Sequence, residues 1–341
     1  MGMLCAVAIA SLGAAVAAAD DGEIRLMSYN ILHGKGADRK VDIRRTAEAI
    51  VRERPDFVGL QEVDCHVSRS GRIDEPAELA RLTGLHPTFA SAFPYKGGEY
   101  GRAILSREKP LAVERVRLDG KHPGVLLLCE FPDFWFGTMH LDLAETNRLR
   151  QVGIVRNAVA AKSRDKPVFL TGDWNATPKS RTLAAMREFM TVLSTEKHRT
   201  FHGFKGGKIA KDYCIDYIAI DNAHAEKVAV WETHVTEEPV ASDHNPVVAV
   251  VALGAAVKPV EERVRQTPGG PRIFVDGKAV RPRDGLSLKK GLPIILCMHC
   301  PIDTPRIRRA ANKYWKRDNL KAVVGSYGEV EKEIFNTEKD K

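Results

Sequence analysis

Eight polar residues lie at the ends of apolar, strand-like segments, where side chains reach the edge of a β-sheet. They are Asn30, Glu62, His140, Asp173, Asn175, Asp216, Asp243 and His244. One polar strand end is ordinary, because such ends are commonly exposed to water. A buried carboxylate is costly unless a cation or hydrogen bonds compensate it, so the full set predicts one shared polar site.

The residue types in this set favour metal-assisted acid–base chemistry. Carboxylate and amide oxygens suit Mg²⁺ or Mn²⁺ better than a structural Zn²⁺, which prefers thiolates and imidazoles. An Asp beside a His fixes the tautomer of the ring and raises its basicity, so the imidazole can move protons.

The segments between these residues predict the elements that position them. Residues 42–54 and 145–163 have the apolar spacing of amphipathic helices, and Pro55 ends the first. Strands are predicted at residues 24–29, 57–60, 168–170, 215–220, 228–231 and 247–253. Many strands and few helices favour two packed sheets flanked by helices over a parallel doubly wound sheet.

Composition is that of a globular protein. The 341 residues are 44% hydrophobic and 28% charged, which excludes disorder of the whole chain and collagen-like repeats. Residues 1–254 hold 33 basic and 33 acidic residues, so the net charge of +8 lies entirely in residues 255–341. A neutral body with a basic tail differs from a uniformly basic nucleic-acid binder.

The N-terminal segment predicts export. Residues 3–19 are almost wholly apolar and end in three alanines, so we interpret residues 1–19 as a signal peptide and expect a secreted or periplasmic protein. No basic residue precedes Arg25, which leaves open an uncleaved anchor or a different start. Cleavage leaves five cysteines, of which Cys129 and Cys214 lie in apolar stretches and are expected to be buried thiols.

Six short motifs, in order, resemble those of the endonuclease/exonuclease/phosphatase superfamily. They are MSYNI (27–31), LQEVD (60–64), GRAILSR (101–107), GTMHLD (137–142), GDWN (172–175) and SDHNP (242–246). The resemblance covers about residues 23–254 and implies a four-layered α/β/β/α sandwich like that of deoxyribonuclease I, with residues 20–254 as the catalytic domain. It also implies cleavage of a phosphoester by an activated water with the help of Mg²⁺ or Mn²⁺.

The resemblance also assigns roles to single residues. Glu62 resembles the principal metal ligand, assisted by Asn30 and Asp243. Asp173 resembles the residue that orients or deprotonates the attacking water. The other catalytic residues it implies are Asn175, which helps hold water or phosphate, His244 as the catalytic imidazole, Asp216 as its orienting carboxylate, and His140 as a donor to phosphate or the leaving group. Whether Asp173 or His244 is the base stays open.

Two further residues are candidates for binding the substrate. Arg102 stands where the family often has Asn, and its guanidinium either binds the substrate phosphate or pairs with Glu99. Tyr100 either contacts phosphate or packs. The stretch from Cys65 to Tyr100, rich in Gly and Pro, is predicted to form rim loops that select the substrate.

Three functions remain in competition. His140 resembles the family branches that include secreted deoxyribonuclease-like enzymes, sphingomyelinases and phospholipid-processing relatives. We therefore expect a monomeric phosphoester hydrolase acting on a lipid headgroup, a sugar phosphate or a nucleotide-type ester. The alternatives are a non-specific endonuclease and a catalytically silent binding protein of the same fold.

Residues 255–341 lie outside the resemblance and form a basic C-terminal extension of uncertain structure. Residues 306–321 predict a basic helix that touches an anionic membrane surface or nucleic acid, or is simply solvated. Cys297, His299 and Cys300 lack the partner cluster that a structural metal site needs.

Overall fold

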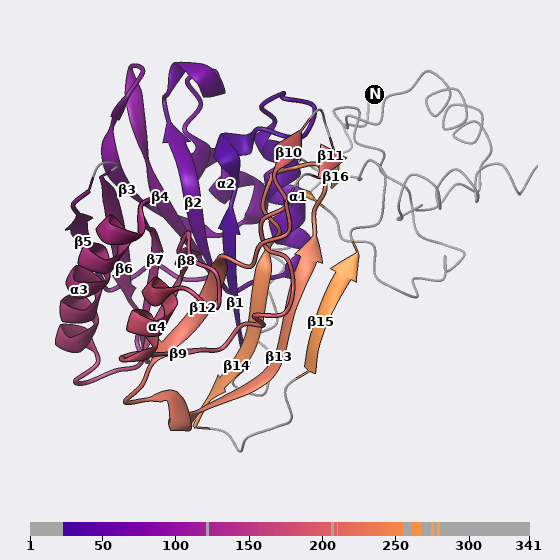
Figure 1. Cartoon of the computed structure of the whole chain (residues 1–341). Coiled ribbons are helices and arrows are strands. Elements are labelled where there is room, and N and C mark those ends of the chain that lie inside the picture. Colours follow the sequence, from indigo (N-terminus) through magenta and orange to yellow (C-terminus); the bar gives the residue numbers. More distant parts are fainter. Residues whose placement is uncertain are drawn as a thin grey trace, which may run out of the picture.

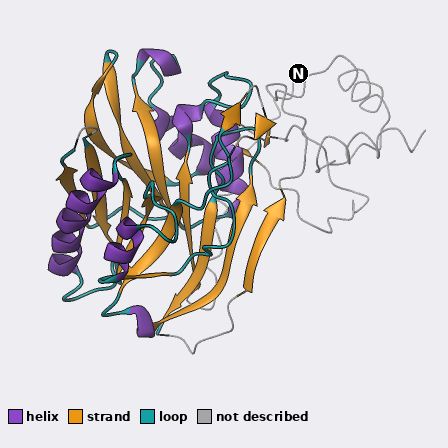
Figure 2. Ribbon diagram, viewed as in Figure 1, coloured by secondary structure: helices purple, strands orange, loops and turns teal. Residues whose placement is uncertain are grey.

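A computed structural model describes residues 23–120, 123–205, 208–209, 211–254, 261–266, 274–275 and 278–279. The predicted signal peptide and most of the C-terminal extension lie outside the described residues. Two β-sheets face each other, and helices cover their outer sides (Figures 1 and 2). The predicted four-layered sandwich is confirmed.

The first sheet has seven strands in the order β15-β13-β14-β1-β2-β4-β3. Their bounds are β1 Glu23–Asn30, β2 Phe57–Cys65, β3 His86–Tyr95, β4 Gly98–Ser106, β13 Val228–Glu237, β14 Val247–Leu253 and β15 Glu261–Gln266. Helices α1 (Ile43–Glu53) and α2 (Glu75–Thr83) accompany this sheet. Strand β15 belongs to the stretch assigned to the extension, and it pairs in parallel with β13 at the sheet edge.

The second sheet has six strands in the order β5-β6-β7-β8-β12-β9. Their bounds are β5 Ala112–Leu118, β6 Gly124–Glu130, β7 Trp135–His140, β8 Val168–Asp173, β9 Met190–Val192 and β12 Asp216–Asp221. Helices α3 (Glu145–Lys162) and α4 (Arg181–Arg187) accompany it. Short elements complete the described part: 3₁₀ turns at Leu32–Gly34, Ser68–Ser70 and Ala225–Lys227, and the strand pairs Phe204–Lys205 with Lys208–Ile209 and Phe274–Val275 with Lys278–Ala279.

Three hydrophobic clusters separate the four layers. Alternation along each strand sends successive side chains to opposite faces: Leu26 and Phe57 point into the cluster between the sheets, and Met27 and Val58 into the cluster under α1 and α2. A third cluster lies between the second sheet and α3 and α4. Cys129 and Cys214 are buried, as predicted.

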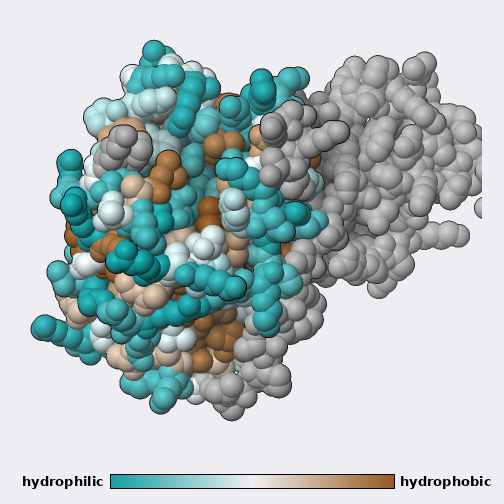
Figure 3. Space-filling model, viewed as in Figure 1, coloured by the Kyte–Doolittle hydropathy of each residue, from teal (hydrophilic) through white to brown (hydrophobic). Residues whose placement is uncertain are grey.

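The outer surface is mostly hydrophilic, with smaller apolar patches, on the face that Figure 3 shows. Among the described helices, none has both the length and the apolar character needed to cross a membrane.

The prediction of rim loops between Cys65 and Tyr100 is right for residues 66–74, which carry Arg69 to the cavity, and wrong for the rest. The stretch holds α2 and most of an antiparallel hairpin, in which β3 pairs with β4 across a turn at Lys96 and Gly97. Both turn residues have positive φ, 41° and 81°, as tight hairpin turns require. The prolines of β3 do not break the sheet, because β3 is an edge strand with one unpaired side.

The two sheets approach closely at Gly59 of β2. A Cβ atom there would overlap Thr171 Oγ1 of β8 and stand 2.7 Å from Thr138 Oγ1 of β7. Two residues further on, Gln61 Nε2 donates a hydrogen bond to Thr138 Oγ1 at 2.8 Å. This close contact fixes the spacing of the sheets next to Glu62.

We expect Gly59→Ala to lower the free energy of unfolding by about 1–3 kcal/mol, because the added methyl group forces the sheets apart. Gly153→Ala is the matched control, since Gly153 lies on α3 with open space around it. That change should raise stability by about 0.5–1 kcal/mol. Urea unfolding of the two variants checks both values, and equal stabilities would contradict the role given to Gly59.

Candidate active site

The second sheet aligns three predicted site residues in one row. Parallel pairing of β7 with β8 sets His140 beside Asp173, and antiparallel pairing of β8 with β12 sets Asp173 beside Asp216. Residues directly opposite on neighbouring strands point to the same face. The register of the sheet therefore brings together side chains that lie up to 76 positions apart in the sequence.

A β-bulge in the first sheet brings Glu62 to the same place. The register of β2 against β4 shifts between Gln61 and Val63, and Glu62 has a φ of 58°. A bulged residue leaves the regular ladder, so its side chain is re-aimed. Burial raises the pKa of Glu62, which marks a carboxylate held partly away from water.

Asn30 joins the two sheets. Its Nδ2 donates hydrogen bonds to Glu62 Oε1 and to Asp173 Oδ2, each at 3.1 Å. Its Oδ1 accepts a hydrogen bond from the backbone N–H of Leu32 at 3.1 Å. In this arrangement Asn30 orients two carboxylates, and its predicted role as a metal ligand stays a prediction.

His244 lies between two buried aspartates. Its Nδ1 is 2.9 Å from Asp216 Oδ2, and its Nε2 is 3.6 Å from Asp173 Oδ2. The loop that carries it is tied to β1, because Ser242 Oγ donates to the Asn30 carbonyl at 2.7 Å and accepts from the His244 N–H at 3.2 Å. The predicted Asp216–His244 pair is therefore present in the geometry.

The charges of the two histidines differ. Burial opposes protonation of His244, but Asp216, Asp173 and Asp243 together raise its pKa to about 10. Burial lowers the pKa of His140 well below its ordinary value, and Arg102 and His244 lower it further. At neutral pH the site thus holds one imidazolium and one neutral imidazole.

Asp173 stands at the centre of these contacts. Burial and the neighbouring Asp216 raise its pKa. Its Oδ2 lies 3.4 Å from His140 Nε2, and its Oδ1 accepts a hydrogen bond from the Asn175 N–H at 2.9 Å. Asn175 itself has a φ of 49° and donates from Nδ2 to the Leu141 carbonyl at 2.9 Å. The arrangement suits a carboxylate that accepts a proton.

The ten predicted site residues converge on a cavity of about 660 Å³. Eight of them line it: Glu62, Tyr100, Arg102, His140, Asp173, Asn175, Asp243 and His244. The other two, Asn30 and Asp216, lie behind this wall and contact it through Glu62, Asp173 and His244.

Arg102 points at the cavity without an ion-pair partner among the described residues. Only 3% of its surface is exposed, its guanidinium lies 5.2 Å from the centre of the Tyr100 ring, and one of its nitrogens donates to the Gly101 carbonyl at 2.6 Å. No ion pair with Glu99 forms among these residues. A buried guanidinium on a cavity wall suits an anionic ligand.

Sequence reasoning missed the remainder of the cavity wall. Arg69 lies over the rings of Tyr95 and Tyr100, at 4.8 and 5.5 Å, and makes two hydrogen bonds to Asp64. Phe201, Lys211 and Tyr213 also line the cavity. These residues belong to no motif. The clustering of aromatic and basic residues near position 95 was a signal for Tyr95 alone.

Several side chains in this region offer donor atoms for a metal. Asp173, Asp216 and His244 offer atoms within 4.8 Å of one another, but the hydrogen bond between Asp216 and His244 already uses two of them. Asp216 Oδ1 and Asp243 Oδ1 are both buried without a hydrogen-bond partner among the described residues. Glu62 accepts one hydrogen bond there, from Asn30.

Comparison with solved structures agrees with this fold. An endonuclease/exonuclease/phosphatase from Beutenbergia cavernae is 23% identical, with a TM-score of 0.55 over 69% of this chain and 72% of that one. A mannosyl-6-phosphatase from Bacteroides thetaiotaomicron is 16% identical, with a TM-score of 0.52 over 67% of this chain and 100% of its own. A 2′,3′-cyclic phosphatase is 14% identical, with a TM-score of 0.52 over 68% of this chain and 96% of that one.

At these identities the structural similarity establishes the fold alone. The sequence evidence is broader, because the profile of the Endonuclease/Exonuclease/phosphatase family matches residues 27–244, from the first motif to His244 in the last. This chain therefore belongs to the endonuclease/exonuclease/phosphatase family.

Proposed function

We propose that the protein is a divalent-metal-dependent hydrolase of small phosphoesters, such as a sugar phosphate or a nucleotide-type ester. The observation that carries the proposal is the convergence of Glu62, Asp173, His140 and His244 on one wall of a cavity that Arg102 also lines. Carboxylates, imidazoles and a guanidinium around one space suit hydrolysis at phosphorus.

A divalent cation fits the oxygen atoms on this wall. Glu62 and Asp243 would hold it, since both carboxylates line the cavity and Asp243 Oδ1 has no hydrogen-bond partner among the described residues. Both are hard carboxylate donors, as Mg²⁺ and Mn²⁺ prefer. When bound, the cation would neutralise the negative charge that grows on a phosphate oxygen.

We assign the other catalytic roles to four side chains of the protein. Asp173 is the group that orients a water molecule and takes its proton. His244, flanked by three carboxylates, is held as an imidazolium and donates a hydrogen bond to a phosphate oxygen. His140 is neutral and donates through one ring N–H, and Arg102 binds the phosphate.

The dimensions of the cavity favour a small substrate. A volume of about 660 Å³ lies in the range that holds one compact ligand. Its aromatic side chains, among them Tyr100 and Phe201, suit the face of a sugar ring or a base. A duplex-specific nuclease gains much of its affinity from basic residues along the DNA backbone, and residues 1–254 carry no net positive charge.

Asp173→Asn should lower kcat with Mg²⁺ by about 10²–10⁴-fold, the usual contribution of a general base. The control is Asp133→Asn, since Asp133 is exposed and lies outside the cavity. Hydrolysis of a chromogenic phosphomonoester and phosphodiester, with Mg²⁺ and with a chelator, measures both effects. Chelator-resistant activity, or an Asp173→Asn variant as active as Asp133→Asn, would refute the proposal.

Asp216→Asn should lower kcat by about 10²–10⁴-fold while KM changes little, because an amide cannot hold His244 as an imidazolium in the same orientation. Asp216 does not line the cavity, so substrate binding should persist. Steady-state kinetics with the chromogenic ester separates the two constants. A rise in KM with unchanged kcat would place Asp216 in substrate binding instead.

The substrate class is tested with a panel containing a sugar 6-phosphate, a nucleoside 2′,3′-cyclic phosphate, a glycerophosphodiester and supercoiled plasmid. We expect release of phosphate or opening of the ring in at least one small ester, and no plasmid nicking. Nicking that weakens as salt is added would favour the endonuclease alternative. Absence of all hydrolysis, with metal bound, would favour a silent binding protein.

A further inference from the structure

A second group of potential metal ligands lies where β2 ends, in the loop beside the cavity. Cys65 is the last residue of β2, and His66 follows it. The chain then loops outward and returns at Asp74, which forms an isolated β-bridge with Cys65. The His66 N–H donates to the Ile73 carbonyl at 2.9 Å, so both ends of the loop are fixed by backbone hydrogen bonds.

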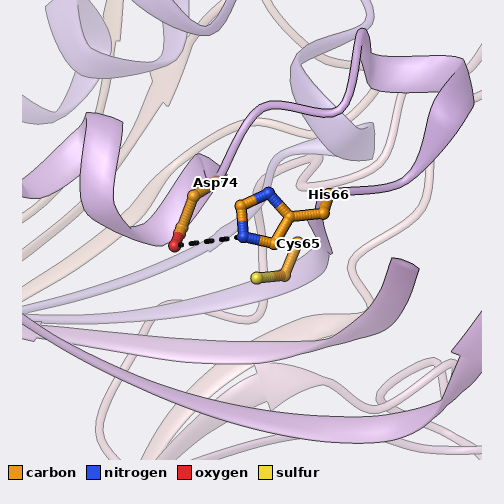
Figure 4. Close-up of side chains that lie close together, drawn as sticks. All are labelled: Cys65, His66 and Asp74. Atoms are coloured by element: carbon orange, nitrogen blue, oxygen red, sulfur yellow. Dashed lines mark ion pairs between the residues drawn. The ribbon is translucent and has the colours of Figure 1, made fainter. Parts of the chain in front are cut away.

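The three side chains point toward one another (Figure 4). The Cys65 sulfur, one His66 ring nitrogen and one Asp74 oxygen all lie within 4.8 Å of one another. His66 Nε2 and Asp74 Oδ2 are 3.9 Å apart, which is too far for a hydrogen bond. The two side chains are 62% and 40% exposed, so an ion has access from solvent.

Two of the three ligands, His66 and Asp74, already have a hydrogen bond that orients them for a metal. His66 Nδ1 lies 3.2 Å from the Arg72 carbonyl, and this contact fits an N–H donor at Nδ1 and leaves the lone pair on Nε2. Asp74 uses Oδ1 to cap α2, accepting from the Ala77 N–H at 3.0 Å, and so keeps Oδ2 for another partner. His66 Nε2 and Asp74 Oδ2 both face the space between the three side chains.

We propose that Cys65, His66 and Asp74 bind one Zn²⁺ ion. A thiolate, an imidazole and a carboxylate form a borderline-soft donor set that zinc accepts, with water in the fourth position. Two negative ligands and one neutral ligand balance the charge of the ion. Ligand atoms around tetrahedral zinc stand about 3.3–3.8 Å apart, so atoms within 4.8 Å of one another need to close by up to about 1.5 Å.

The ion would brace the loop that carries Arg69 to the cavity wall. Arg69 lies between Cys65 and Asp74 in sequence, and from there it reaches over Tyr95 and Tyr100. This zinc site is separate from the oxygen-rich site at Glu62 and Asp243. A test of the proposed phosphoesterase activity does not decide whether this zinc site exists, and the reverse also holds.

Titration of the metal-free, full-length protein with Co²⁺, a spectroscopic substitute for Zn²⁺, tests the proposal. We expect a thiolate-to-cobalt charge-transfer absorption that saturates at one equivalent and disappears on adding Zn²⁺. Cys65→Ser should abolish this absorption. His66→Gln and Asp74→Asn should weaken binding at least tenfold, and Asn at position 74 keeps the helix cap intact.

The Cys297→Ser/Cys300→Ser double variant is the control, because it removes the other Cys/His grouping in the chain. It should keep the absorption at one equivalent. Circular dichroism of Cys65→Ser in chelator checks that this variant folds. The proposal is overturned by an absorption that persists in Cys65→Ser, by one that vanishes in the double variant, or by none in the folded wild type.

Discussion

The site depends on the crowding of buried carboxylates around one imidazole. Asp173, Asp216 and Asp243 surround His244, and their combined negative charge outweighs the burial that would otherwise keep the ring neutral. Burial, together with the neighbouring Asp216, raises the pKa of Asp173. One arrangement therefore keeps the His244 imidazolium protonated and makes Asp173 more basic than an ordinary aspartate.

Sheet geometry makes this crowding possible. His140, Asp173 and Asp216 occupy one row because three strands pair in that register, and Glu62 joins them from the other sheet through a bulge. Asn30 then bridges the sheets with two hydrogen bonds. The arrangement tolerates little movement, because the sheets already touch beside Gly59, where a single methyl group has no room.

The hairpin of β3 and β4 supplies residues of the cavity wall that lie outside the six motifs. Tyr95 and Tyr100 lie on its two strands, and Arg69 reaches them from the loop between Cys65 and Asp74. A sequence rich in Gly and Pro resembles a loop, so this hairpin was not predicted. An edge strand accepts proline because half of its backbone groups need no partner. This part of the cavity wall therefore lies where the local sequence signals for secondary structure are weakest.

The sequence by itself determined the layered fold and the order of the motifs, and it predicted eight residues of the cavity wall, because apolar periodicity, polar strand ends and motifs are local properties. It left open how Arg102 is used, and it missed Arg69, Phe201 and the approach of His66 to Asp74. Those depend on a bulge, a hairpin and a loop that join residues distant in sequence. Only tertiary structure decides such contacts, since strand register and loop closure follow from the packing of the whole molecule.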